Sequence, residues 1–265
     1  MMLDVNHVYK TFHPGTINER RALAGVDLHL EEGDFVTVIG GNGAGKSTLL
    51  NAVAGVWPVD GGSIVIDGND ITGLPDYKRA PFIGRVFQDP MMGTAPDMQL
   101  EENLALAYRR GKKLGLRWHI NREERDMYRE RLRELNLGLE DRLTTKVGLL
   151  SGGQRQAVTL LMASLQKPRL LLLDEHTAAL DPATAAKVLE LSDRIVRENG
   201  LTTMMITHNM KDAIRHGNRL IMMNKGEIIF DCRGEEKAKL TVEDLLEKFA
   251  QISGSTLDND RALLG

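Results

Sequence analysis

The chain has 265 residues, of which 42% are hydrophobic and 27% are charged, a composition typical of a folded soluble protein with one large domain or two small ones. Its formal net charge of −3 argues against a basic nucleic-acid-binding surface, so no nucleic-acid partner is expected. The single cysteine, Cys232, excludes an internal disulfide. The apolar runs fall short of the roughly 18 to 20 residues of a membrane-spanning helix, and residues 1–10 lack the apolar core of a signal peptide.

The first third of the chain predicts strands around a glycine-rich loop. Alternating apolar and polar residues indicate antiparallel strands over Leu3–Val8 and Ala22–Leu30. A β-branched run, Phe35–Ile39, ends in glycines and is followed by helical spacing over Lys46–Ala54. Another short strand is predicted over Ser63–Asp67.

The middle of the chain is predicted to be helical. Helical patterns cover Glu101–Arg110 and Arg122–Leu135, with hardly a strand-like run nearby. We therefore expect a helical subdomain over 89–165, inserted into an α/β core made of 1–88 and 166–253. The last residues, 254–265, show no strong periodicity and are expected to form a loosely held tail.

Strand patterns return in the last third of the chain, together with one long helix. The predicted strands are Leu170–Leu173, Thr203–Thr207, Leu220–Met223 and Glu227–Asp231, and the helix is Ala183–Glu198. Because buried strands here alternate with helices, we predict an α/β fold with a mainly parallel sheet covered on both faces.

The glycine-rich loop carries the first chemical motif. The run from Gly40 to Ser47, GGNGAGKS, fits the pattern G-x-x-x-x-G-K-[ST] and lies between a predicted strand and a predicted helix. Such a loop lets backbone N–H groups and the start of the helix converge on phosphate oxygens. Lys46 is expected to reach the β- and γ-phosphates, and Ser47 to offer its hydroxyl to Mg²⁺. The alternative is a flexible loop that only resembles the pattern. The predicted nucleotide contacts are Gly40, Asn42, Gly43, Ala44, Gly45, Lys46, Ser47 and Thr48.

Two carboxylates follow the buried strand Leu170–Leu173. Asp174 would lie at the carboxyl end of this strand, where α/β sheets bind ligands, and could hold Mg²⁺ opposite Ser47. Glu175 would then orient or deprotonate an attacking water. Two surface acids at the end of a core strand are the alternative.

A third motif identifies the family that the chain resembles. The run LSGGQ, from Leu150 to Gln154, resembles the signature of the ATP-binding-cassette (ABC) ATPases. From the residues alone, Ser151 can cap a helix that runs from Gly152 toward Gln166, and two glycines permit close approach to a γ-phosphate. A plain turn and helix cap is the alternative reading of this run.

The resemblance covers nearly the whole chain and implies further site residues. It implies a P-loop NTPase fold with an ABC-type core, an antiparallel β subdomain and an inserted α-helical subdomain. Phe12 matches the position that stacks on adenine, although core or edge packing would also suit it. His208 matches the histidine that contacts the γ-phosphate and positions Glu175, and the run from Ala179 to Asp181 matches a loop between protomers. The implied catalytic residues are Lys46, Gln88, Glu175 and His208; the implied metal-site residues are Ser47, Gln88 and Asp174; the implied signature contacts to ATP are Ser151, Gly152, Gly153 and Gln154.

One position departs from the family pattern. His176 stands where the family usually has proline after the two carboxylates. Loss of proline frees φ and restores an N–H, so a less rigid loop is expected. A titrating histidine beside Glu175 also suggests that turnover depends on pH at about 6 to 7.

The resemblance also implies ligands and partners. These are ATP and Mg²⁺, a homodimer in the ATP-bound state, an integral membrane permease and, in an importer, a solute-binding protein, with the chain on the cytoplasmic face of the membrane. Met91, Met92 and Met98 could contact the permease, or could fill the core. We expect an importer ATPase, for amino acids and in particular aromatic ones. The alternatives are a lipid or lipoprotein exporter, a cassette acting on ribosomes or DNA, and a non-hydrolysing scaffold.

Overall fold

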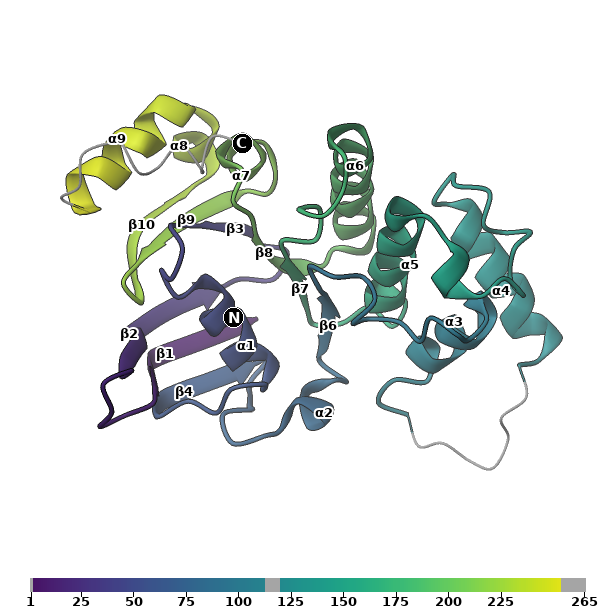
Figure 1. The fold of residues 1–265 in the computed structure, drawn as a ribbon, viewed down its shortest axis with the longest axis horizontal. Helices are drawn as coiled ribbons and strands as arrows, with labels where there is room; N and C mark the ends of the chain where they lie inside the picture. Colours follow the sequence, from purple (N-terminus) through teal and green to yellow (C-terminus); the bar gives the residue numbers. More distant parts are fainter. Residues whose placement is uncertain (1, 113–119, 254–265) are drawn as a thin grey trace. The chain divides into compact units, whose positions relative to one another are not determined.

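The structure is a computed structural model that describes residues 2–112 and 120–253. The chain divides into two compact units, one made of residues 1–79 and 200–265 and the other of residues 80–199 (Figure 1). The predicted tail, 254–265, lies outside the described residues. The predicted division into a core and a helical subdomain over 89–165 stays a prediction.

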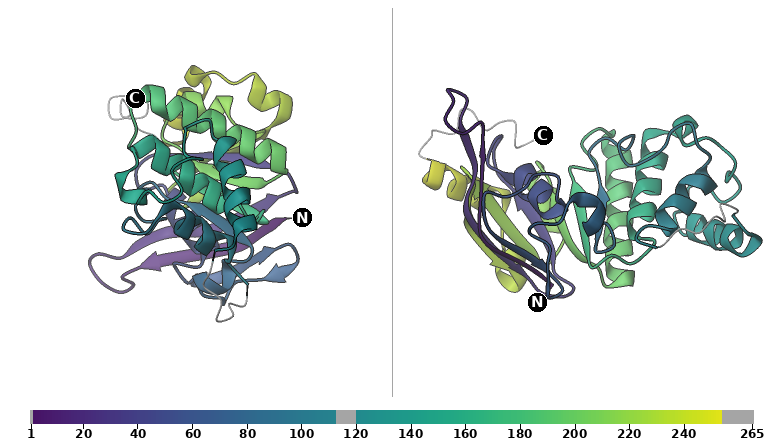
Figure 2. Two further views of the ribbon diagram at one scale, coloured as in Figure 1. Left: turned by 90° about the vertical axis from the view of Figure 1, so that its right-hand side faces the viewer. Right: turned by 90° about the horizontal axis from the view of Figure 1, so that it is seen from below.

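The first unit begins with an antiparallel sheet, as predicted. Its strands follow the order β2-β1-β4-β5. They are β1 (Leu3–Phe12), β2 (Arg20–Leu30), β4 (Gly61–Ile66) and β5 (Asn69–Asp70). Leu3 and Val5 are buried, as their alternation predicts, and Val8 is buried beyond a register shift that interrupts the alternation. Figure 2 shows β1 and β2, in purple, as a long hairpin.

The second group of strands in this unit is mainly parallel. The order is β10-β9-β3-β8. The strands are β3 (Phe35–Ile39), β8 (Thr202–Ile206), β9 (Arg219–Asn224) and β10 (Glu227–Arg233). Strand β3 runs parallel to both β8 and β9, whereas β9 and β10 form an antiparallel hairpin. Every residue of β3 and β8 is buried, which is why these strands read as continuous apolar runs.

The helices of the first unit include several that the sequence patterns did not predict. They are α1 (Lys46–Ala54), α2 (Asp76–Arg79), α7 (Met210–Arg215), α8 (Gly234–Ala238) and α9 (Val242–Ser253). Of these, only α1 was predicted. Met210 of α7, Leu245 and Phe249 of α9 and Leu220 of β9 belong to one buried apolar cluster.

The second unit is mostly helical, with a parallel strand pair. Its strands are β6 (Ile83–Val86) and β7 (Leu170–Asp174), and its α-helices are α3 (Leu100–Tyr108), α4 (Arg122–Arg133), α5 (Gly152–Ser164) and α6 (Pro182–Asn199). A 3-10 turn, Val147–Leu149, precedes α5. The helices agree with the predicted spans except at their ends. Strand β6 was not predicted, because four residues that include Gly84 and Arg85 carry too little pattern.

No helix within the described ranges has both the length and the apolar character that crossing a membrane requires.

Candidate functional site

The predicted phosphate loop connects β3 to α1. Gly40, Gly43 and Gly45 have φ of +149°, +79° and +106°, a region that side chains rarely adopt. A Cβ atom on Gly40 would lie 2.2 Å from the carbonyl oxygen of Met223. Glycine is therefore needed both for the turn and for its close packing against β9.

The start of α1 leaves backbone donors available to an anion. The cap residue, Gly45, has no side chain that could accept the N–H groups of the first turn. Lys46 is 5% exposed, and its Nζ donates to the carbonyls of Gly40 (2.6 Å) and Gly41 (3.2 Å). Ser47 is exposed and Thr48 is half-buried. Asn42 and Ala44 belong to the same loop, whose arrangement is compatible with the phosphate cradle that the motif predicts.

Two neighbours that were not predicted hold the outer part of this loop. The N–H of Gly226, in the turn between β9 and β10, donates to the carbonyl of Ala44 (2.9 Å), while its own carbonyl accepts from Ala24 (3.0 Å). From β2, Nη2 of Arg20 donates to the carbonyl of Gly43 (3.0 Å). The Lys225-Gly226 turn has positive φ at both residues and could have been recognised in the sequence, but its contact with the loop could not.

His208 lies at the same edge of the strands as the phosphate loop. Strands β3 and β8 pair in parallel, with Val38 opposite Ile206, and the N–H of Thr207 donates to Val38. The residues that follow each strand therefore leave the sheet side by side. His208, one residue later, is half-buried.

Phe12 ends β1 as part of a small aromatic and charged cluster. Its half-buried ring meets Trp57 edge to face, with centroids 5.4 Å apart, and Nζ of Lys10 lies 5.7 Å from its centroid. Asp60 accepts from Lys10 (2.9 Å) and from the N–H of Thr11 (2.5 Å). Burial works against ionisation of Asp60, but these hydrogen bonds hold its pKa below the usual value. The end of β1 is thus anchored beside the ring.

In the second unit, Gln88 and the two predicted acids share one edge of a strand pair. Strands β6 and β7 are parallel, with Val86 opposite Leu173, so the residues after each strand lie at the same edge. Gln88 is exposed there, and Asp174 and Glu175 are half-buried.

Asp174 has a positively charged neighbour that was not predicted. Nη2 of Arg85 lies 3.3 Å from Oδ2 of Asp174, and both side chains are 15% exposed. Burial lowers the pKa of Arg85, and the charge of Asp174 opposes this shift. The guanidinium also lies 4.5 Å from the ring centroid of Phe87. A cation therefore already neighbours the carboxylate that is predicted to hold the metal.

The residues after Asp174 form an anchored turn. Glu175 has φ of +45°, an uncommon conformation for a side chain other than glycine. His176 is 2% exposed, and its Nε2 lies 2.9 Å from Oγ of Ser192 on α6. Because the Ser192 hydroxyl donates to Val188 (2.8 Å), Nε2 of His176 carries the hydrogen that bonds to Ser192. The expectation of a less rigid loop stays a prediction, and this buried contact to α6 is one interaction that holds the loop.

The signature residues begin α5, as predicted. Oγ of Ser151 accepts from the N–H of Gln154 (3.2 Å), and the Gln154 side chain accepts from the N–H of Ser151 (3.2 Å). Gly152 is exposed and Gly153 is half-buried. The Ser151 hydroxyl keeps its own hydrogen for another acceptor. Ser151, Gly153 and Gln154 line a pocket of about 650 Å³. Asp181 caps α6 by accepting from the N–H of Thr184 (3.1 Å).

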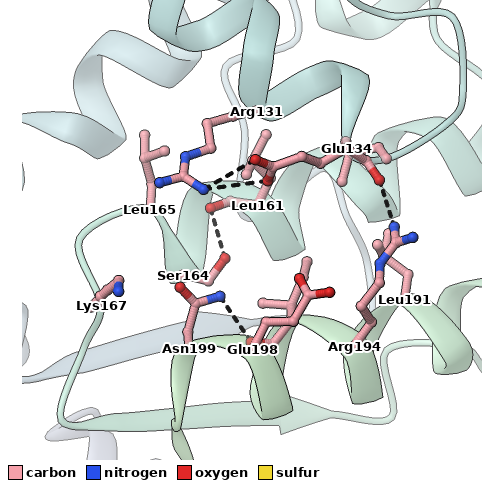
Figure 3. A pocket seen from close by; sticks show the side chains of 12 residues that line it. Arg131, Glu134, Leu161, Ser164, Leu165, Lys167, Leu191, Arg194, Glu198 and Asn199 are labelled. Atoms are coloured by element: carbon pink, nitrogen blue, oxygen red, sulfur yellow. Dashed lines mark hydrogen bonds and ion pairs between the residues drawn. The ribbon is translucent and has the colours of Figure 1, made fainter.

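A second pocket in this unit, of about 290 Å³, lies among α4, α5 and α6 (Figure 3). Arg131 pairs with the Glu134 carboxylate, and Arg194 of α6 donates to the carbonyl of Glu134 (2.6 Å). None of the predicted site residues lines this pocket. It shares Leu135, Leu191 and Arg194 with the pocket that the signature residues line.

The donor types suit Mg²⁺. Hydroxyl, amide and carboxylate oxygens from Ser47, Gln88 and Asp174 are ligands that this ion prefers, and it keeps several waters and binds through phosphates. Within the described ranges, three or more His, Cys, Asp or Glu side chains do not gather into a metal cluster. A site with a single carboxylate that is completed by phosphate fits both observations.

Comparisons with known proteins agree with these motifs. The family described as ABC transporter matches residues 23–178. The chain is 47% identical to a tyrosine transport ATP-binding protein of Clostridioides difficile (strain R20291), over 94% of this chain and 98% of that protein. It is 33% identical to a xylose/arabinose import ATP-binding protein of Sulfolobus acidocaldarius, over 94% of this chain and 95% of that protein.

The fold agrees as well. The structure resembles that of the ATP-binding cassette MJ0796, solved as a dimer in a post-hydrolysis state bound to ADP and Pi, with a TM-score of 0.75 and 31% identity over 88% of this chain and 98% of that one. The predicted P-loop NTPase fold and the resemblance to ABC ATPases are thereby confirmed. The chain belongs to the ABC transporter family, as an ATP-hydrolysing cassette.

Proposed function

We propose that this chain is the subunit that binds and hydrolyses ATP in an importer of aromatic amino acids. The observation that carries the proposal is the 47% identity to a tyrosine transport ATP-binding protein, over nearly the full length of both chains. The relative named for xylose and arabinose import is matched over a similar share of its length, at 33% identity, and supports import in general. The higher identity to the tyrosine transport protein favours an amino acid over a sugar as the substrate.

The proposed catalytic roles belong to the phosphate loop and His208 of the first unit and to Gln88, Asp174 and Glu175 of the second. The backbone N–H groups at the start of α1 and the ammonium of Lys46 bind the β- and γ-phosphates of ATP. Glu175 accepts a proton from the water that attacks the γ-phosphorus, and ADP leaves as the bond to the β–γ bridging oxygen breaks. His208 contacts the γ-phosphate and positions Glu175, and Gln88 senses the nucleotide. Mg²⁺, held by Ser47, Gln88 and Asp174, would neutralise phosphate charge.

A second copy of the chain completes each site in this proposal. The sequence contains one phosphate loop and one LSGGQ run. In the proposed dimer, the N–H groups at the start of α5 and the Ser151 hydroxyl of one copy close over the γ-phosphate bound by the other copy. The dimeric form of the similar cassette MJ0796 supports this arrangement. ATP binding would close the dimer, and hydrolysis would open it.

The proposed partner is an integral membrane permease on whose cytoplasmic side the chain docks. Met91 and Met92 are 38% and 71% exposed, and Met98 is half-buried, so the segment after Gln88 offers adaptable apolar side chains to such a partner. A solute-binding protein would deliver the amino acid.

Reconstituted transport tests the proposed substrate. The chain would be purified with the membrane protein that accompanies it, placed in proteoliposomes with its solute-binding protein, and supplied with ATP on the side that carries the cassette. We expect ATP-dependent movement of labelled tyrosine toward that side, none with Lys46→Ala, and no movement of labelled xylose. Movement of a lipid in the opposite direction would instead support the exporter alternative.

A further inference from the structure

Arg20 lies between the two parts of the site that would hold opposite ends of a nucleotide. It begins β2, which forms a hairpin with β1 (Figure 1), and its partner residue in the strand register is Phe12. Its guanidinium reaches the phosphate loop, where Nη2 donates to the carbonyl of Gly43 at 3.0 Å. Arg20 is thus paired with Phe12 and hydrogen-bonded to the phosphate loop, and all three belong to the same unit.

Close approach of the guanidinium depends on glycine. A Cβ atom on Gly43 would lie 2.1 Å from Nη2 of Arg20, closer than any real contact. Gly43 also has φ of +79°. Gly43 therefore has two roles. It leaves space for the Arg20 guanidinium, and it adopts the positive φ that the turn of the loop requires.

No carboxylate of the described residues is paired with Arg20. Within residues 2–112 and 120–253, its hydrogen bond to Gly43 is accompanied by no ion pair. Lys10, the other cation near Phe12, is paired with Asp60 at 2.9 Å. An arginine has five N–H donors in a planar fork that matches phosphate oxygens, and one bond to a carbonyl leaves most of them available.

We infer that Arg20 is a nucleotide-binding residue that contacts the phosphate chain of ATP or ADP. With adenine on Phe12 and the β- and γ-phosphates at the start of α1, the stretch of nucleotide between them is the ribose and the α-phosphate. The guanidinium lies beside that path and supplies the charge-assisted hydrogen bonds that an α-phosphate accepts. This inference rests on the proposed nucleotide contacts of Phe12 and of the phosphate loop.

Equilibrium binding of ATP and ADP to the full chain, measured by calorimetry without turnover, tests the inference. Arg20→Gln should weaken both nucleotides about tenfold, as loss of a charge-assisted phosphate contact does. Arg21→Gln is the matched control, because Arg21 is also exposed and lies next along the same strand, where successive side chains point to opposite faces. The control should bind as the parent does.

Two further measurements separate a phosphate contact from a structural role. A charge that contacts phosphate makes binding weaker in salt, so the salt dependence of the dissociation constant should be shallower for Arg20→Gln than for Arg21→Gln. The unfolding midpoint without nucleotide should be the same for both variants. Equal affinity of Arg20→Gln and parent, or an unchanged salt dependence, would overturn the inference. Failure of the parent itself to bind ATP would instead overturn the nucleotide site on which the inference rests.

Discussion

Glu175 and His176 occupy a turn in which an unusual backbone conformation is secured by a buried side chain. A non-glycine residue at positive φ costs about 1 to 3 kcal/mol and persists only where its surroundings fix it. At Glu175, φ is +45°, and the next residue, His176, is hydrogen-bonded to Ser192 on α6. We expect this contact of His176 to help hold the proposed base, Glu175, in place.

A double-mutant cycle measures that contact. His176→Ala should lower the free energy of unfolding by about 2 to 3 kcal/mol, because it removes a buried hydrogen bond and leaves a cavity. The coupling energy between His176→Ala and Ser192→Ala should be about 1 kcal/mol, measured by urea unfolding. If the two changes are additive, the hydrogen bond does not anchor the turn.

The pH dependence expected of His176 is tested by activity. If the imidazole influences Glu175, the ATPase pH profile of His176→Pro should differ from that of the parent at about pH 6 to 7. Coinciding profiles would remove this role and leave the anchoring role intact.

At the scale of single residues, the motifs predicted which residues belong to the candidate site, but not which side chains contact them. Lys46, Asp174 and Ser151 could be proposed as site residues because each chemical role requires a particular group at a particular spacing. Arg20 and Arg85 could not, because their contacts depend on strand register and on side chains far away in the sequence.

The phosphate loop depends on the hairpin of β9 and β10. Gly226 has φ of +83°, and a Cβ atom there would lie 2.8 Å from the carbonyl oxygen of Ala22. Gly226→Ala should therefore destabilise the fold by about 2 kcal/mol and weaken ATP binding, because the bond to Ala44 is displaced.

Gly33→Ala is the matched control for that substitution. Gly33 has φ of +82° but nothing within 4 Å of an added Cβ, and it precedes β3 rather than following it. This control should lose about 1 kcal/mol of stability and bind ATP normally. Equal nucleotide affinity in the two variants would show that the hairpin does not hold the loop.

The start of α5 combines a helix cap with a proposed phosphate contact, and two substitutions separate these roles. Ser151→Ala should cost about 1 kcal/mol of stability, since the cap to Gln154 is lost. Ser151→Asp should keep that stability, because aspartate also caps helices, yet it should abolish ATP-driven dimerisation by repelling the γ-phosphate. Dimerisation of Ser151→Asp at the parent level would contradict the phosphate contact.

Elements were predictable where their periodicity was strong. The pattern gave β3 and α1 with the bounds that the structure has, because a buried run and a glycine loop mark their ends. Strand β6 is too short for a pattern to appear. Helices α7 and α9 were not predicted, because their stability comes from the buried apolar cluster that they share with Leu220 and Met222 of β9.

At the scale of the whole molecule, the chain is a cassette with one phosphate loop and one signature run. Its family and fold could be predicted because three motifs occur in a fixed order. The substrate class could be expected only from the family resemblance, because no residue of the cassette is proposed to contact the transported solute. We propose that the chain acts through the association of two copies, which ATP binding and hydrolysis control.

The most direct test is the mass of Glu175→Gln in solution with ATP and Mg²⁺, measured by light scattering after gel filtration. This substitution should retain nucleotide binding and stop hydrolysis, so a dimer should accumulate with ATP. The dimer should be absent with ADP, and absent with ATP when Lys46→Ala is added. A Glu175→Gln protein that binds ATP at saturation and stays monomeric would contradict the proposed two-copy site.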